Sequence, residues 1–163
     1  MRNDWQPGGG SAQTRNANRS TTSQRAGSRD EIGISNEDLD QFEGRLAQLQ
    51  DAYSREDYEA LRKSTTPEMM GYLSQELGEN ASKGVRNEVF DVALLSGDIS
   101  EAWREGNDQY ATVAMRYESR DVTRERATGR IVDGEDALTT TVELWTFVKR
   151  GNGAWLVSAI QEA

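Results

Sequence analysis

Residues 139–160 read TTTVELWTFVKRGNGAWLVSAI, and this stretch decides the fold. Large apolar residues alternate with smaller or polar ones over 139–149 and again over 154–160, a period of two that indicates β-strands. The intervening Gly151-Asn152-Gly153 is typical of a hairpin turn. The sequence therefore predicts that the chain ends in a pair of antiparallel strands.

Both faces of this strand pair carry large apolar side chains. Alternation places Trp145 and Phe147 opposite Val142, Leu144 and Val148, and it places Trp155, Val157 and Ala159 opposite Leu156 and Ile160. A sheet with one face in water normally carries polar side chains there. Three explanations remain open: the chain itself or a second copy covers the second face, another protein or a lipid chain binds it, or the strand register differs.

Three further strands precede this pair. The same alternation predicts strands at 85–95, 101–104 and 109–122, with a hairpin turn at Gly106-Asn107-Asp108. The stretch 123–137 is polar and contains two glycines, so we expect a long exposed loop there.

Upstream of the strands, the apolar period becomes helical. The apolar positions of the first helix recur at alternating steps of three and four residues: Leu39, Phe42, Leu46, Leu49 and Tyr53. Ser35 can cap this helix, with Asp38 reaching back as in a capping box, and Ile34 and Leu39 are spaced as a hydrophobic staple.

Two shorter helices are expected next. Ser54 with Asp57 predicts a second cap, and Tyr53 with Tyr58 predicts a second staple. Thr66-Pro67-Glu68 should open a third helix, with a cap, a proline at the first position and an acid in the first turn. Helices followed by strands predict an α+β domain, with the helices packed on one face of an antiparallel sheet.

Composition excludes several kinds of site, because the 163 residues include no histidine and no cysteine. A Ser-His-Asp or Cys-His nucleophile, a zinc site built from His or Cys, and a disulfide are therefore ruled out. The sequence suggests no metal and no cofactor. Any proton transfer would have to use Asp, Glu, Tyr, Lys or Arg.

Charge is distributed unevenly along the chain. Residues 1–29 carry five arginines and one aspartate, a balance of +4, which leaves −13 on the remainder of a chain with net charge −9. An acidic globular part argues against nucleic acid as the partner. We expect residues 1–33 to be a disordered basic linker, either simply solvated or in contact with an anionic lipid surface. The sequence has no apolar run of about 18 residues and no secretory signal.

Four motifs, in order along the chain, resemble the C-terminal domain of bacterial Tim44-like proteins. They are Thr66-Pro67-Glu68-Met69, then 101–106 (EAWREG), 143–150 (ELWTFVKR) and 155–161 (WLVSAIQ), and the similarity runs from about Asn36 to Gln161. These proteins are relatives of the mitochondrial inner-membrane translocase subunit that tethers the matrix heat-shock chaperone to the import channel. The resemblance implies an NTF2-like fold: three N-terminal helices closing a cone of curved antiparallel sheet, with a pocket at its mouth.

The same resemblance implies a non-catalytic binding or scaffold domain associated with the bacterial inner membrane, with the cytoplasmic side favoured. A protein, an anionic lipid or a second copy of the chain would be its partner. Bacterial members usually carry hydrophobic segments upstream, and their absence suggests that this sequence begins downstream of one. The expected organisation is a linker at 1–33 and a Tim44-like domain at 34–163. The family's chaperone-binding segments lie outside this domain, so no residue here is assigned to chaperone contact.

An NTF2-like cone would hold a mostly apolar pocket between its helices and the concave sheet face. The candidate lining residues are Phe42, Tyr58, Met69, Met70, Leu73, Tyr117, Trp145 and Phe147. The alternative is that all eight fill the core. Trp155 and Val157 are candidates for an interface on the other sheet face.

Glu143 should share a face with Trp145 and Phe147. A carboxylate among aromatic rings would have a raised pKa and could act as a proton-transfer base, the layout used by isomerases with the same cone fold. The alternative function is therefore a small-molecule isomerase or cyclase. The competing interpretation pairs Glu143 with a cross-strand arginine such as Arg116, or places it in water at the sheet margin. No catalytic residue is assigned.

Overall fold

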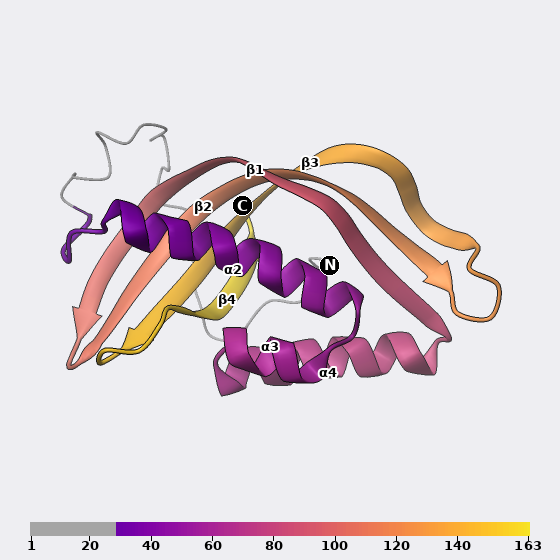
Figure 1. Ribbon diagram of the computed structural model, residues 1–163, viewed down its shortest axis with the longest axis horizontal. Helices are drawn as coiled ribbons and strands as arrows, with labels where there is room; N and C mark the ends of the chain where they lie inside the picture. Colours follow the sequence, from indigo (N-terminus) through magenta and orange to yellow (C-terminus); the bar gives the residue numbers. More distant parts are fainter. Residues whose placement is uncertain (1–28) are drawn as a thin grey trace.

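The computed structural model describes residues 29–163, which form three helices followed by a four-stranded sheet. The elements are α2 (Asn36–Ser54), α3 (Tyr58–Ser64), α4 (Pro67–Ser82), β1 (Val85–Glu105), β2 (Asp108–Glu125), β3 (Ile131–Arg150) and β4 (Leu156–Glu162). Every neighbouring pair is antiparallel, in the order β1-β2-β3-β4. Figure 1 shows the long strands arching over the helices, with α2 across the hollow of the arch and α3 and α4 beneath it. The predicted α+β cone is confirmed.

The helix signals were largely correct. Ser35 and Asp38 form the predicted capping box of α2, at 3.1 and 3.0 Å, and the hydroxyl of Thr66 accepts from the backbone of Met69 at the start of α4. The predicted cap of α3 was wrong, since Asp57 occupies that position and accepts from the backbone N–H of Ala60.

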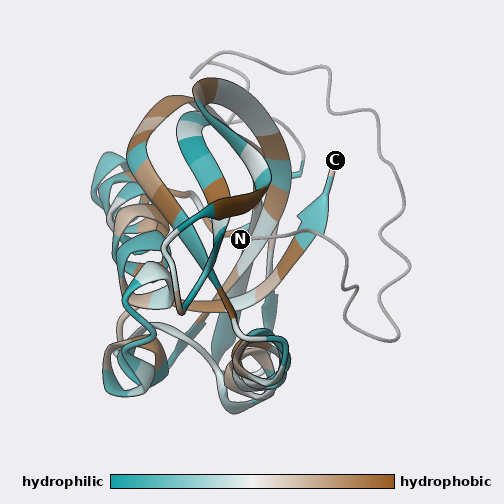
Figure 2. Ribbon diagram, turned by 90° about the vertical axis from the view of Figure 1, so that its right-hand side faces the viewer, coloured by the Kyte–Doolittle hydropathy of each residue, from teal (hydrophilic) through white to brown (hydrophobic). Residues whose placement is uncertain are grey.

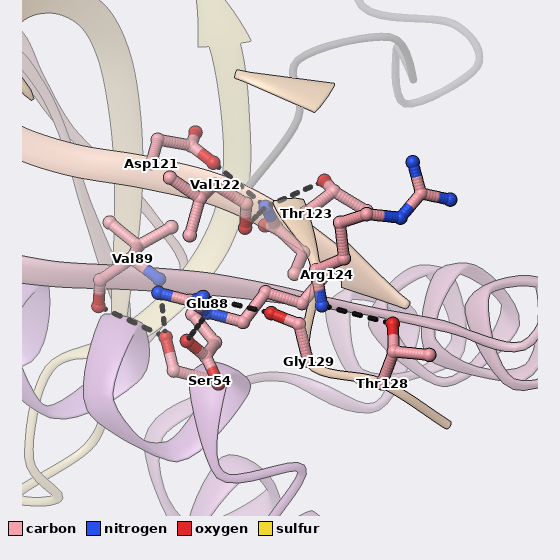
Figure 3. Close-up of polar contacts among 11 residues, drawn as sticks. Ser54, Glu88, Val89, Asp121, Val122, Thr123, Arg124, Thr128 and Gly129 are labelled. Carbon is pink, nitrogen blue, oxygen red and sulfur yellow. Dashed lines mark hydrogen bonds and ion pairs between the residues drawn. The ribbon is translucent and has the colours of Figure 1, made fainter. Parts of the chain in front are cut away.

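Ser54, predicted as that cap, is instead the last residue of α2. Its hydroxyl accepts from the backbone N–H of Val89 at 2.7 Å and donates to the carbonyl of the same residue at 3.0 Å (Figure 3). Of the two tyrosines predicted as a staple, Tyr53 is buried and Tyr58 is 37 % exposed. Ser54 thus joins the end of α2 to β1.

The strands are longer than predicted. β1 runs unbroken through 85–105, and three register shifts against β2 replace the predicted gap. The expected loop at 123–137 was also wrong, because β2 continues to Glu125 and β3 begins at Ile131. Ion pairs between neighbouring strands stabilise these polar stretches of the sheet. One of them joins Arg124 of β2 to Glu88 of β1 at 2.9 Å (Figure 3). A polar strand of this kind lacks the apolar alternation from which a strand is predicted.

A bulge in β4 changes which side chains face the helices. Val157 pairs with Phe147, but Ala159 pairs with Thr146, so Ser158 is the extra residue. Ile160 is thereby turned onto the inward face, where it is 4 % exposed and belongs to the core. The prediction that Ile160 shares a face with Leu156 was therefore wrong.

Short segments cover part of the two sheet edges. The backbone of residues 29–31 bonds to Ala102 of β1, and the Thr66 N–H bonds to the Val157 carbonyl of β4. The Asp30 carboxylate accepts from three backbone N–H groups, those of residues 32–34. Residues 29–31, predicted as part of the linker, thus pair with β1, while residues 1–28 lie outside the described part.

Candidate functional site

The inward face of the sheet has two different halves. The half nearest the β1–β2 and β3–β4 turns is apolar. Phe42 of α2 stacks on Phe147 with ring centroids 4.3 Å apart and meets Trp155 edge-on at 5.1 Å. Trp145, Phe147 and Trp155 are all 0 % exposed. This half is a tightly filled aromatic core.

Polar bonds from α2 hold Trp155 in that core. Its indole N–H donates to the Asp38 carboxylate at 3.0 Å, and the Arg45 guanidinium donates to its carbonyl at 2.8 Å. Burial would raise the pKa of Asp38, but the bonds from Ser35 and Trp155 outweigh it and lower that pKa. Because Trp155 and Val157 are both 0 % exposed, the prediction that they form an interface was wrong.

The structure places most of the eight predicted pocket residues in the hydrophobic core. Seven of them are between 0 and 8 % exposed, namely Phe42, Met69, Met70, Leu73, Tyr117, Trp145 and Phe147. The eighth, Tyr58, lies on α3 and is 37 % exposed. The seven side chains are packed as the core of the cone, in agreement with the alternative considered for them.

Glu143 lies at the inner end of the aromatic core and is 0 % exposed. Its Oε1 accepts from the Tyr117 hydroxyl at 2.8 Å and from the Trp145 indole at 3.0 Å. The Gln50 amide donates to the same hydroxyl at 3.2 Å. The expected pairing with Arg116 or with water was wrong, since Arg116 is exposed on the other face.

Tyr117, predicted only as a pocket residue, is the hydrogen-bond partner of Glu143. Burial, and then the nearby Glu143 carboxylate, raise the pKa of Tyr117 far above its usual range, so it remains a hydroxyl donor. Met115 pairs directly with Glu143, which makes Tyr117 its diagonal neighbour across the two strands. A correct register for residues 139–149 against 109–122 would have identified this contact.

The far half of the inward face is polar. Alternation along β2 continues inward from Tyr117 through Ser119 and Asp121 to Thr123, and Asn87 of β1 pairs with Thr123. A hollow of about 250 Å³ opens here, lined by Asp121, Thr123, Asp133, Gly134, Glu135 and Thr139. Figure 2 looks at this end of the molecule, where the strands curve round and hydrophilic stretches alternate with hydrophobic ones.

Gly134 allows the strands to approach each other beside this hollow. Its φ is +79°, and a Cβ atom on it would lie 2.4 Å from the Asp121 carbonyl oxygen. Only glycine tolerates both conditions. This requirement depends on the pairing of β2 with β3, a part of the sheet that the sequence did not predict.

A second cluster ties the helices to the polar half. Glu56, between α2 and α3, has φ +55° and accepts from Arg86 at 3.0 Å and from Arg126 at 2.9 Å. Burial alone would raise the pKa of Glu56, but the bonds from these two arginines outweigh it and lower that pKa. The cluster joins the helices to β1 and to the β2–β3 turn.

This architecture defines the class: a curved antiparallel sheet around three N-terminal helices is an NTF2-like cone. The intermembrane space region of the chloroplast protein ARC6 is similar, with a TM-score of 0.51 and 11 % identity over 75 % of this chain and 95 % of that chain. A ketosteroid isomerase-like protein from Erwinia carotovora atroseptica SCRI1043 has a TM-score of 0.43 at 21 % identity (77 % and 98 % covered). A protein described as a dehydratase of the NTF2-like family, from Streptomyces avermitilis, has 0.38 at 13 % (79 % and 99 %).

The family model of the Tim44-like domain matches residues 21–162, so the chain belongs to the Tim44-like domain family. The resemblance in the four motifs is thereby confirmed, and the match extends farther upstream than those motifs. A search of curated proteins finds no match. Within residues 29–163, no helix is both long enough and apolar enough to cross a membrane.

Proposed function

We propose that this protein is a non-catalytic binding or scaffold domain that works at a membrane. The observation that carries the proposal is the filled cone. Glu143, Trp145 and Phe147 are 0 % exposed and Tyr117 is 3 % exposed, so solvent does not reach the Glu143 carboxylate. Membership of the Tim44-like family supports the same function.

The outer face of the sheet is the surface we propose for the partner. One cross-strand row there is apolar on all four strands: Trp103, Tyr110 and Leu156 are partly exposed, and Val148 between them is buried. Trp103 and Tyr110 stack at 5.2 Å and are partly exposed, and Val142 on the same face is 45 % exposed. A protein partner fits this mixed surface, because aromatic groups with polar neighbours are typical of interfaces.

We further propose that the domain is held at the inner membrane of a bacterium, on its cytoplasmic side, with arginines of residues 1–28 contacting anionic lipid. Each basic residue near such a surface contributes about 1 kcal/mol. Flotation with cardiolipin-containing vesicles at low and high salt tests this. We expect salt-sensitive binding by the full chain, and its loss when Arg2, Arg15, Arg19 and Arg25 are all changed to Gln.

Failure of the unmodified chain to float at low salt would contradict the lipid part of the proposal. The protein part is tested separately by sedimentation velocity and by pull-down with Trp103→Ala, whose side chain is partly exposed. A second copy of the chain as occupant of the outer face would give a dimer at micromolar concentration. The protein part is contradicted if Trp103→Ala alters neither partner capture nor self-association.

One observation favours a second candidate function, an isomerase or cyclase. The Glu143 carboxylate is buried beside a tyrosine hydroxyl, 2.8 Å away, that could donate to a developing oxyanion. Such an enzyme would need the cone to open before substrate could reach Glu143. Turnover of small β,γ-unsaturated ketones that Glu143→Gln abolishes, without loss of folding, would favour this candidate over the scaffold.

A further inference from the structure

The outer face of the sheet is not covered by any of the three helices. α2, α3 and α4 all lie on the hollow side of the arch, and the convex side carries none of them (Figure 1). Trp103 and Tyr110 stack on this convex side with ring centroids 5.2 Å apart, and both are partly exposed. The described part of the chain therefore leaves an aromatic surface open on the outer face.

Asp98 of β1 lies on the same outer face. Its neighbours along the strand are turned inward, since Ile99 is 6 % exposed in the core and a Cβ on Gly97 would meet Met115 at 3.8 Å. Alternation directs Asp98 the other way, where it pairs with Ala114 of β2. A carboxylate thus lies on the outer face, on the same strand as Trp103.

The Asp98 carboxylate has no partner within residues 29–163, neither a hydrogen-bond donor nor a cation. Partial burial raises the pKa of this carboxyl. Two other acids near the aromatic row are paired. Glu105 accepts from the Trp103 indole at 3.2 Å, and Asp108 lies 3.9 Å from Arg150. An arginine from another segment would supply the counter-charge that Asp98 lacks.

The upstream part of the chain reaches the described domain at this same strand. The Ala102 N–H donates to the Arg29 carbonyl at 2.8 Å, and the Glu31 N–H donates to the Ala102 carbonyl at 2.9 Å, a parallel pairing. Asp98 precedes Ala102 by four residues, as Arg25 precedes Arg29. Continuing the parallel pairing upstream would bring Arg25 beside Asp98, to within the one residue of the bulge between Ile99 and Glu101.

Charge and length favour the same segment as occupant of the outer face. Residues 1–29 carry a balance of +4, against −13 on the remainder of the chain. Crossing four strands takes three steps of about 4.8 Å, roughly 15 Å, which about five extended residues span. Guanidinium groups also stack favourably on exposed aromatic rings such as those of Trp103 and Tyr110. The family model supports continuity with the domain, because its match begins at residue 21.

We propose that residues 1–28 bind across the outer sheet face of their own chain, with Arg25 paired to Asp98 and other arginines over the Trp103–Tyr110 stack. Lipid would then compete for these arginines, and a protein partner would compete for the face. The segment would thereby shield the docking surface until anionic lipid draws its arginines away. This competition, unlike the contact itself, rests on the proposed function.

The contact is tested by NMR on the full-length chain with one nitroxide spin label. The sequence has no cysteine, so Ser11→Cys provides a single attachment site. We expect the label to broaden the amide signals of Tyr110, Val148 and Leu156 and to leave those of α3 and α4, on the hollow side, sharp. Broadening that is equal on the two sides of the sheet, or absent from both, would overturn the proposal.

Charge variants test the pairing at Asp98. Asp98→Asn should lower the paramagnetic relaxation rates on the outer face about threefold, since one charge pair is lost. Glu43→Gln, an exposed acid on α2, is the matched control and should leave them unchanged. Asp98→Arg should lower the rates further, and adding Arg25→Asp should restore part of the loss. Equal rates in the unmodified chain and Asp98→Asn, or no restoration by the second change, would exclude this pairing.

Vesicle flotation tests the competition separately. Asp98→Asn should float with cardiolipin-containing vesicles at about threefold lower lipid concentration than the unmodified chain, because its arginines are released more easily. An equal lipid requirement would overturn the competition and leave the contact standing. Failure of the unmodified chain to float contradicts the lipid part of the proposed function, whereas uniform broadening contradicts only the contact, so the two proposals fail separately.

Discussion

The two halves of the inward sheet face are held together by different kinds of interaction. In the apolar half, Phe42, Phe147 and Trp155 exclude water by packing ring against ring. In the polar half, Asn87 and Asp121 are joined by a hydrogen bond and a hollow remains beside them. The comparison indicates that apolar packing stabilises the first half, whereas hydrogen bonds and ion pairs hold the second half together.

The largest effect should come from truncating the apolar half. Trp155→Ala removes a fully buried indole, and we expect it to lower the free energy of unfolding by about 3 to 5 kcal/mol, measured by urea denaturation. Trp103→Ala, on the outer face and only partly buried, is the matched control. Equal losses from both variants would mean that the apolar half is not the main source of stability.

Glu143, at the boundary between the two halves, should be the next most sensitive position to substitution. Glu143→Ala leaves the Tyr117 hydroxyl and the Trp145 indole N–H without their acceptor, so we expect a loss of about 2 to 3 kcal/mol. Glu143→Gln keeps an acceptor oxygen and should cost less. Thermal unfolding followed by near-UV circular dichroism compares the two, and a more damaging Gln than Ala would contradict this role for Oε1.

Within the polar half, β2 and β3 lie so close together at Gly134 that a side chain there should destabilise the fold. Gly134→Ala meets both a positive φ and a contact of 2.4 Å with a backbone oxygen, and we expect a loss of about 1 to 3 kcal/mol. Gly44→Ala, a helical position with open space around it, should be neutral or stabilising. Hydrogen exchange of the β2–β3 amides would show whether the damage stays in this half.

The smallest effect on the free energy of unfolding should come from substituting Glu56, and this effect should depend on pH. The folded-state pKa of this carboxyl is lowered, so its contribution is present above the unfolded pKa and disappears as pH falls through the folded value. Glu56→Gln should therefore cost about 1 kcal/mol near neutral pH and nothing once acid has protonated the carboxyl in the folded protein. Urea denaturation at pH 7 and in the acid range measures the difference, and a cost that is independent of pH would show that the arginine bonds do not depend on its charge.

Local chemistry made several elements of this protein predictable. The caps at Ser35 and Thr66 act within one turn of the chain, so they needed no knowledge of the rest of the structure. Alternation placed Trp145 and Phe147 on one face, because the side-chain period of a strand is a property of its own backbone. The turn at Gly106-Asn107 was found for the same reason.

Features that depend on a distant partner were missed. The polar strands around 123–137 exist because their acids and arginines meet across the sheet, and Ile160 faces the core because of a bulge against β3. The environment of Glu143 likewise depended on strand register, which brought Tyr117 beside it.

By itself, the sequence determined the helix starts, the antiparallel strands, the absence of His and Cys chemistry and the uneven charge. Tertiary structure alone decided that the indoles of Trp145 and Trp155 are buried and that an acidic hollow opens at the other end of the sheet. The reason is physical: caps and alternation arise from neighbouring residues, whereas burial and register arise from contacts between residues far apart in the chain.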